Sequence, residues 1–237
     1  EDGTRALGAT LAGAPSETVQ WLGSVQAGRS RALDNQGRNT AMDASRTAPN
    51  PQEDRNLSVL GKLVLTPEAG EKHTLTLEHV DKSSEVEGYT ARSTVMGFQT
   101  LDLDGTSDMV RTRLSWDGRF AVRSAWADEL RATLGHQRSE SQETTREQRL
   151  ALATRARSER SRDVSYSEDL WQGVLQAEKT TPLGANWTAR TVYGLDVSVA
   201  ELDNLVTGTA PPTYERYPLK RFPPTRETTS AVFVQSE

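Results

Sequence analysis

The chain has 237 residues, no cysteine, and 28 basic against 33 acidic side chains, which gives a formal net charge of −5. This mild acidity argues against a nucleic-acid binder, whose surface is basic, and the lack of cysteine excludes disulfides, iron–sulfur clusters and thiolate zinc sites. Apolar residues make up only 35% of the chain, so a large dry core is not expected. No run of about 18 apolar residues is present, which excludes a membrane-spanning helix, and no charged-then-apolar leader opens the chain, so no signal peptide is expected.

Strict alternation of apolar and polar residues recurs along the chain, and this period of two is typical of strands with one apolar and one polar face. Trp21 and Val25, for example, share one face, and Gln20 and Ser24 share the other. The segments run to about 9–13 residues, against about 5–6 in ordinary strands and about 9–11 in a tilted membrane strand. The chain is therefore predicted to be β throughout, with strands at Arg5–Gly13, Thr18–Ser30, Asn56–Thr66, His73–Lys82, Ser107–Asp117, Glu129–Arg138, Trp171–Ala177, Trp187–Val197 and Thr228–Glu237.

The predicted connections alternate between short and long. Turns rich in proline and glycine are expected at Ala14–Glu17, Pro67–Glu71 and Thr181–Ala185, with a somewhat longer one at Asp117–Trp126. Long polar loops are expected at Arg31–Arg55, Ser83–Thr106, Ser139–Arg162 and Leu202–Glu227, although loops above about 12–15 residues are uncommon in compact domains. Because hairpins separate them, the long loops must all leave one end of the sheet. This asymmetry is typical of outer-membrane β-barrels.

Two side-chain patterns favour the membrane barrel over a soluble sheet. Trp21, Trp116, Trp126 and Trp187 lie near the short turns, where an aromatic girdle at a membrane interface would lie, and Trp171 belongs toward the other rim. The face opposite the apolar one carries charges that suit a wet lumen and would be costly in a closed core: Lys62, Glu78, Arg111, Arg113, Arg131 and Arg190. The alternative is that the five tryptophans fill the core of a soluble β-sandwich.

Several loop and strand motifs carry a family resemblance. Asp34–Gly37 (DNQG) and Arg46–Gln52 (RTAPNPQ) precede a strand with Leu60–Leu63 (LGKL). Near the end, Tyr217–Pro223 (YPLKRFP) precedes Phe233–Glu237 (FVQSE), in which Ser236 stands where aspartate is usual. Together these motifs resemble those of the TonB-dependent haem and haemoglobin receptors of the Gram-negative outer membrane.

The resemblance implies an antiparallel up-and-down barrel of 22 strands with short periplasmic turns, long extracellular loops and an N-terminal plug. It further implies uptake of haem from haemoglobin or a haem-carrier protein, energised by the TonB complex through the plug. Haem would be the transported ligand, with no intrinsic cofactor, and the partners would include outer-membrane lipid. With about nine predicted strands and no plug, residues 1–237 are expected to be an internal part of the barrel. A siderophore receptor of the same superfamily, a soluble ligand-binding β-barrel and a passive porin are the alternatives.

One loop combines aromatic and basic residues in a way that suits a porphyrin. Tyr214, Tyr217 and Phe222 could stack on the ring, while Lys220 and Arg221 could pair with its propionates. Alternatively, these residues and the neighbouring prolines pack the loop over the barrel mouth.

The histidines are the next candidates, because histidine commonly holds haem iron. His73 follows a short turn, away from any ligand entering at the long loops, and His79 and His136 fall on the apolar parity as interface residues. The axial-ligand motifs of the family are missing, so no axial ligand is assigned.

Two further segments are rich in charged residues. Asp102–Gly105 (DLDG) with Asp108 is similar to a calcium loop but lacks the rest of the spacing, which favours a solvated acidic loop. The charged stretch Thr145–Arg162 is expected to form a helical turn or a projecting hairpin. No nucleophile–base pair, zinc-protease motif or phosphate loop is found, so neither a catalytic residue nor a metal site is predicted, and the protein is not expected to be an enzyme.

Overall fold

The structure is a computed structural model that describes residues 3–212 and 214–237. One antiparallel sheet contains all ten strands, and nine of them lie side by side in chain order, while the two-residue β5 pairs with β6. The strands are β1 (Arg5–Ser16), β2 (Val19–Arg31), β3 (Gln52–Leu65), β4 (Glu71–Glu87), β5 (Thr94–Val95), β6 (Phe98–Ala121), β7 (Glu129–Ala151), β8 (Arg157–Pro182), β9 (Thr188–Thr209) and β10 (Thr225–Ser236). The 3-10 turn η1 (Tyr89–Ala91) is too short to cross a membrane, and no other helix of the described chain could do so.

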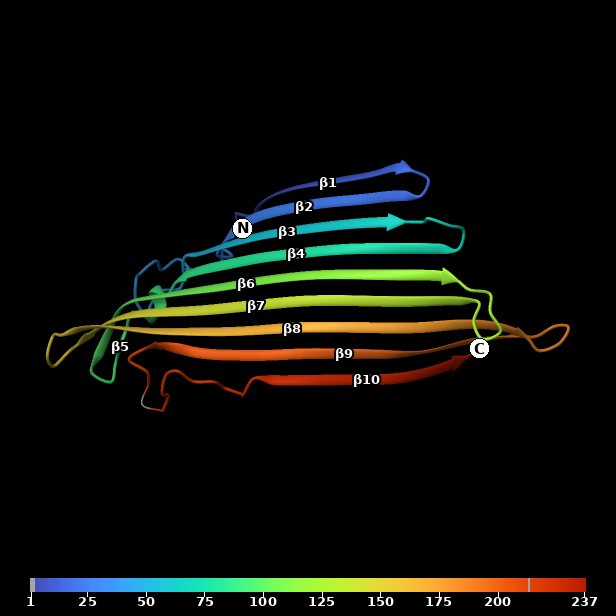
Figure 1. The fold of residues 1–237 in the computed structure, drawn as a ribbon. Coiled ribbons are helices and arrows are strands. Elements are labelled where there is room, and N and C mark those ends of the chain that lie inside the picture. Colours follow the sequence, from blue (N-terminus) through green and yellow to red (C-terminus); the bar gives the residue numbers. More distant parts are fainter. Residues whose placement is uncertain (1–2, 213) are drawn as a thin grey trace.

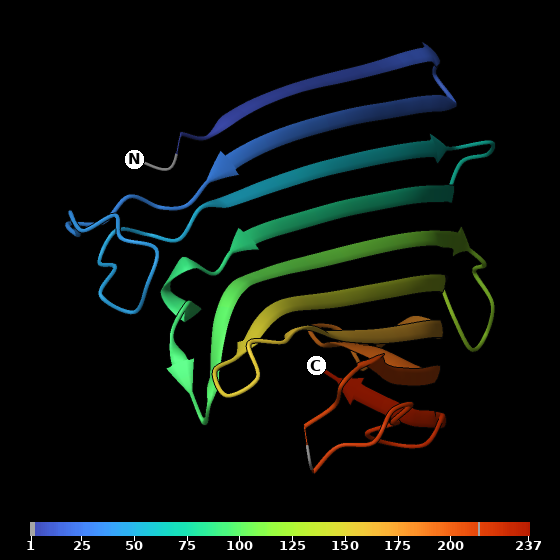
Figure 2. The same cartoon turned by 90° about the vertical axis from the view of Figure 1, so that its left-hand side faces the viewer.

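The sheet is a curved, open layer. Figure 1 shows the long strands running alongside one another, with tight connections at one end and extended connections at the other. Figure 2 shows that the sheet bends as it passes from β1 to β10. Within the described residues, β1 pairs only with β2 and β10 only with β9, so these two strands form the sheet edges. We call the two ends of the strands the short-turn end and the long-loop end.

The strand register groups the alternating side chains into two faces. Trp21 lies opposite Leu63, Leu63 opposite Leu75, and Leu75 opposite Trp116. Because directly paired residues point to the same side of a sheet, these side chains share one face, which we call the apolar face. The other, the polar face, includes Glu78 paired with Arg113. The predicted all-β, up-and-down antiparallel fold is thus confirmed.

The long loops are shorter than predicted, because the strands continue past the apolar stretches. The range Ser139–Arg162 is mostly hairpin, since β7 ends only at Ala151 and β8 begins at Arg157. The loops are reduced to residues 32–51, 88–97, 152–156 and 210–224, of which Thr213 lies outside the described residues. In the β7–β8 hairpin both faces are mostly polar beyond Arg138, so the backbone ladder continues without the apolar alternation that marks a strand in sequence.

The loop of residues 32–51 is held in a defined shape by its own side chains. The Arg46 guanidinium donates hydrogen bonds to the carbonyls of Pro49 (2.7 Å) and Thr40 (2.8 Å), and it lies over the ring of Tyr89, 5.1 Å from its centroid. The Asn50 amide donates to the Thr90 hydroxyl at 3.0 Å. The segment that carries the RTAPNPQ motif is therefore fastened to η1.

Candidate functional site

The apolar face carries a continuous band of exposed apolar side chains. Leu134 on β7 is 57% exposed and Leu7 on β1 is 84% exposed. Soluble monomers rarely expose apolar patches of more than a few hundred Å², whereas this band crosses all nine long strands. Its exposed members are Leu7, Leu11, Trp21, Val25, Leu57, Leu75, Leu77, Val110, Leu114, Leu134, Trp171, Leu175, Leu195, Val197, Val232 and Val234.

Aromatic rings border this band at the short-turn end. The Trp116 indole N–H donates to His73 Nδ1 at 3.3 Å, and the His73 ring lies 5.4 Å from that of Phe120. The Tyr193 hydroxyl donates to the Trp126 carbonyl at 2.6 Å. Trp116, His73 and Tyr193 each combine an apolar ring with a hydrogen-bonded polar atom, the combination that suits a membrane interface.

The opposite border, toward the long loops, is also amphipathic. His136 stacks on Trp171 with ring centroids 4.3 Å apart, and its Nε2 lies 3.0 Å from the Asp169 carboxylate. His79 Nδ1 lies 2.9 Å from the Thr112 hydroxyl. The register places His79 and His136 on the apolar face, as predicted. His73 lies on the same face, close to the short turn that it follows.

Charged pairs follow directly beyond this border. Arg29 and Arg55 both bind Glu53, and Arg138 binds Glu140 at 2.6 Å. On β3, the apolar run from Leu57 to Leu65 is on the order of 27 Å long at about 3.4 Å per residue. A strand of this length that is tilted by about 35–45° rises about 19–22 Å, which is most of the height of the apolar layer in transmembrane barrels, about 25 Å.

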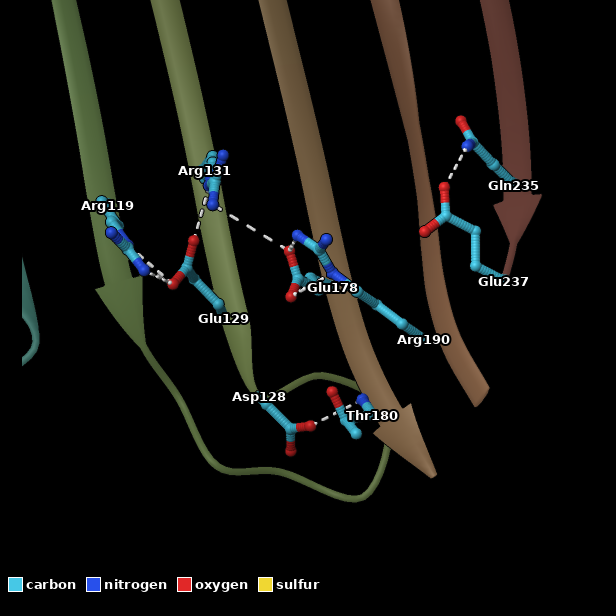
Figure 3. Close-up of polar contacts among 9 residues, drawn as sticks. All are labelled: Arg119, Asp128, Glu129, Arg131, Glu178, Thr180, Arg190, Gln235 and Glu237. Atoms are coloured by element: carbon cyan, nitrogen blue, oxygen red, sulfur yellow. Dashed lines mark hydrogen bonds and ion pairs between the residues drawn. The ribbon is translucent and has the colours of Figure 1, made fainter. Parts of the chain in front are cut away.

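The polar face holds an ion-pair network at the short-turn end (Figure 3). Arg119 and Arg131 both donate to Glu129, at 2.6 Å and 2.5 Å. Arg190 forms a two-pronged pair with Glu178, with both nitrogen–oxygen distances 2.8 Å. The network runs from β6 to β9, so it ties four neighbouring strands together. Its position confirms that Arg131 and Arg190 lie on the polar face, and the register places the other predicted residues there: Lys62, Glu78, Arg111 and Arg113.

The turn between β6 and β7 is anchored to β8 by one carboxylate. Asp128 accepts a hydrogen bond from Lys179 Nζ at 2.7 Å and another from the Thr180 backbone N–H at 2.8 Å. These two donors, Lys179 first, hold the pKa of the Asp128 carboxyl below its usual range. Lys179 also donates to the Ser124 carbonyl at 2.8 Å, which fixes the turn at a second point.

The five residues predicted to contact a porphyrin do not form one cluster but contact different partners. Lys220 Nζ lies 2.6 Å from the Asp203 carboxylate, while the Tyr217 hydroxyl donates to Glu215 at 3.1 Å and Arg221 lies 3.9 Å from the same carboxylate. Burial, together with the Glu215 carboxylate, raises the pKa of Tyr217. The remaining two candidates lie apart: Phe222 packs edge-on against Tyr166, and Tyr214 is 84% exposed.

A residue that sequence reasoning missed, Asn204, holds this loop against the sheet. Its side chain is buried, donates to the Phe222 carbonyl at 3.0 Å and accepts from the Arg221 N–H at 2.7 Å. Next to it, Leu219 and the fully buried Val206 exchange two backbone hydrogen bonds. Residues 219–224 therefore continue the line of β10 along β9. Nothing in the sequence distinguishes Asn204 from a solvated polar residue.

The acidic segment Asp102–Gly105 is neither a calcium loop nor a solvated loop, because residues 102–108 lie within β6. The Asp102 carboxylate is paired with Arg92 at 2.6 Å. Leu101 and Leu103 alternate with the two aspartates, but Asp102, Asp104 and Gly105 are residue types that favour turns, and they concealed this strand.

No protein-family model and no curated protein matches this chain. Among the residues that the structure describes, no group of three histidine or acidic side chains is placed to hold a metal ion. The candidate functional surfaces are thus the apolar face with its aromatic and charged borders, the polar face with its ion pairs, and the loop around Glu215 and Asn204.

Proposed function

We propose that residues 1–237 form part of the wall of an outer-membrane β-barrel, with the apolar face toward lipid and the polar face lining a wet lumen. The exposed apolar band carries this proposal, because water would destabilise it and lipid would not. A soluble ligand-binding barrel would need the opposite arrangement, with Leu134 and Trp171 inside and Arg111 and Arg131 outside.

Within this class, the motif resemblance supports a TonB-dependent receptor that imports haem from haemoglobin or a haem carrier into a Gram-negative cell. The wall and its long loops would supply part of the extracellular vestibule, and a plug would transmit energy from TonB. The fastened loop 32–51 suits a receptor that must hold a bulky ligand. Tyr214, Tyr217, Lys220, Arg221 and Phe222 are the candidate contacts. A siderophore receptor of the same superfamily is the second candidate, and neither requires an enzymatic activity.

The lack of native cysteine permits a direct test of which face meets lipid. Leu134→Cys reports on the apolar face and Gly135→Cys on the polar face, and a Cβ added at Gly135 meets no heavy atom within 4 Å. Each variant is labelled with an environment-sensitive fluorophore and refolded into phosphatidylcholine vesicles. Brominated lipid should quench the label at position 134, and aqueous iodide should quench the label at position 135. Quenching in the reverse sense, or by iodide at both positions, contradicts the membrane wall.

The substrate is tested separately by titrating haemin into the chain in neutral micelles and into the receptor that contains it. Haem import predicts a shifted Soret band, which weakens in the Tyr214→Ala/Tyr217→Ala variant. If no spectral change occurs with either protein, haem is removed from the proposal, and a response to a ferric siderophore would favour the second candidate.

A further inference from the structure

Four basic side chains lie on the middle of the polar face without a partner. They are Lys62 on β3, Lys82 on β4, and Arg111 and Arg113 on β6. Lys82 lies opposite Met109, which precedes Arg111 on the same face, and Arg113 lies opposite Glu78. Unlike Arg119, Arg131 and Arg190 at the short-turn end, none of the four forms an ion pair or hydrogen bond within the described parts of the chain.

The polar face also carries carboxylates, but none of them forms an ion pair with the four cations within the described residues. Glu78 lies opposite Arg113, and Glu168 lies opposite Ser139, which is the partner of Arg111. Asp54 accepts hydrogen bonds from neutral groups, the Gln52 amide at 2.8 Å and the Ser84 hydroxyl at 2.7 Å. Arg111 and Arg113 follow each other on one face of β6, where like charges repel, and a bound anion would relieve that repulsion.

A groove of about 540 Å³ lies beside Lys82, the member of the four cations that is nearest the long-loop end. Its polar-face lining includes Gln26, Asn56, Lys82, Ser84, Ser107 and Met109, together with Asp54, whose carboxylate already accepts the hydrogen bond of the Ser84 hydroxyl. The volume falls within the range of about 300–1,000 Å³ found for small-molecule sites. Amide, hydroxyl and ammonium groups in the lining provide hydrogen-bond donors, and Arg111 follows Met109 along β6.

We propose that this groove and the row Lys82, Arg111, Arg113 and Lys62 bind a small organic anion with several acidic groups, and lead it along the polar face toward the short-turn end. The inference rests on the proposed function, because the polar face must line a wet lumen. Cations along low-dielectric walls concentrate field lines and attract counter-ions, and each guanidinium can hold a carboxylate or sulfonate through two hydrogen bonds.

The test uses the trisulfonated dye pyranine and the chain refolded into phosphatidylcholine vesicles, with binding read by fluorescence anisotropy. Pyranine is expected to bind, and to bind more weakly as salt rises. The Lys82→Gln/Arg111→Gln/Arg113→Gln variant should bind about tenfold more weakly, at less than about 1 kcal/mol for each exposed charge contact. The charge-retaining Arg111→Lys/Arg113→Lys variant should bind nearly as well as the unmodified chain.

The matched control is Arg155→Gln/Arg157→Gln, which removes two exposed cations at the tip of the β7–β8 hairpin and should leave binding unchanged. Lipid quenching of a label at Leu134→Cys reports insertion in every sample. Insertion without pyranine binding, or equal losses in the control and the polar-face variant, overturns this inference and leaves the membrane wall standing. Failure to insert overturns both.

Discussion

Asn204 shows how one buried amide can replace strand pairing. Beyond Leu202, β10 no longer pairs with β9, and the backbone of residues 221 and 222 would lack partners at this point. The side chain supplies one acceptor and one donor, to the Arg221 N–H and the Phe222 carbonyl. Unpaired backbone groups in a part-buried position are costly, so the loop depends on this residue.

Asn204→Ala should release the loop and cost about 1–3 kcal/mol of stability, the usual penalty for a buried polar group left unsatisfied. Limited trypsin digestion in micelles is expected to cleave after Arg221 faster than in the unmodified chain, while cleavage after Arg155 keeps its rate. Ser198→Ala, on the same strand and face, is the control. An unchanged rate at Arg221 would show that the loop holds without the amide.

Asp128 predicts a pH dependence whose sign is fixed by its partners. Because the folded-state pKa lies below the unfolded value, its stabilising contribution is present above the unfolded pKa, about 3.9, and is lost as pH falls through the folded pKa. Asp128→Asn should therefore lower the urea midpoint at pH 7 and have a smaller effect near pH 3. An equal effect at both pH values would contradict the ion pair with Lys179.

At the scale of single elements, alternation located the strands as far as the apolar band extends. The parity of each strand fixes the shared face of Trp21, Leu63 and Leu75. A one-residue slip of any strand would move all its apolar side chains to the wrong face. The same rule fails beyond the band. In β7 from Ser139 to Ala151, both faces are mostly polar. The strand continues there through backbone hydrogen bonds, which the side-chain pattern does not reveal. The pairing of Lys220 with Asp203 depends on how the loop folds back onto β9, and side-chain parity does not reveal it.

The two faces of β7 should respond oppositely to a charge. Leu134→Arg places a guanidinium in the middle of the apolar face, where a transmembrane strand loses about 2–4 kcal/mol. Gly135→Arg adds the same group one residue later on the polar face, into open space, and should be tolerated. Urea unfolding from phosphatidylcholine vesicles compares the two variants, and equal stability would show that β7 does not meet lipid.

At the scale of the whole molecule, the open sheet exposes two edges. The outer backbone groups of β1 and β10 have no strand beside them within the described chain, and such edges readily recruit further strands. The chain of residues 1–237 in neutral micelles is therefore expected to associate through these edges.

Sedimentation equilibrium should show a mean mass that rises with protein concentration. Ala6→Lys/Ala231→Lys places a lysine on the polar face of each edge strand and should reduce association without disturbing the band. A single monomeric mass at all concentrations would contradict edge pairing.

The chain-order topology also determines how the sheet can be assembled. Since every long strand pairs with its predecessor, growth can proceed hairpin by hairpin, and each connection sets the entropy lost in adding the next strand. The loop of residues 32–51 is longer than the loop of residues 152–156 by about two doublings. For a flexible loop, this length adds about 1.2 kcal/mol to the entropic cost of closure. The Arg46 contacts with Thr40 and Pro49 lie within this loop. Formed early, they would shorten the effective loop and make the addition of β3 to β2 depend on a surface motif rather than on the strands.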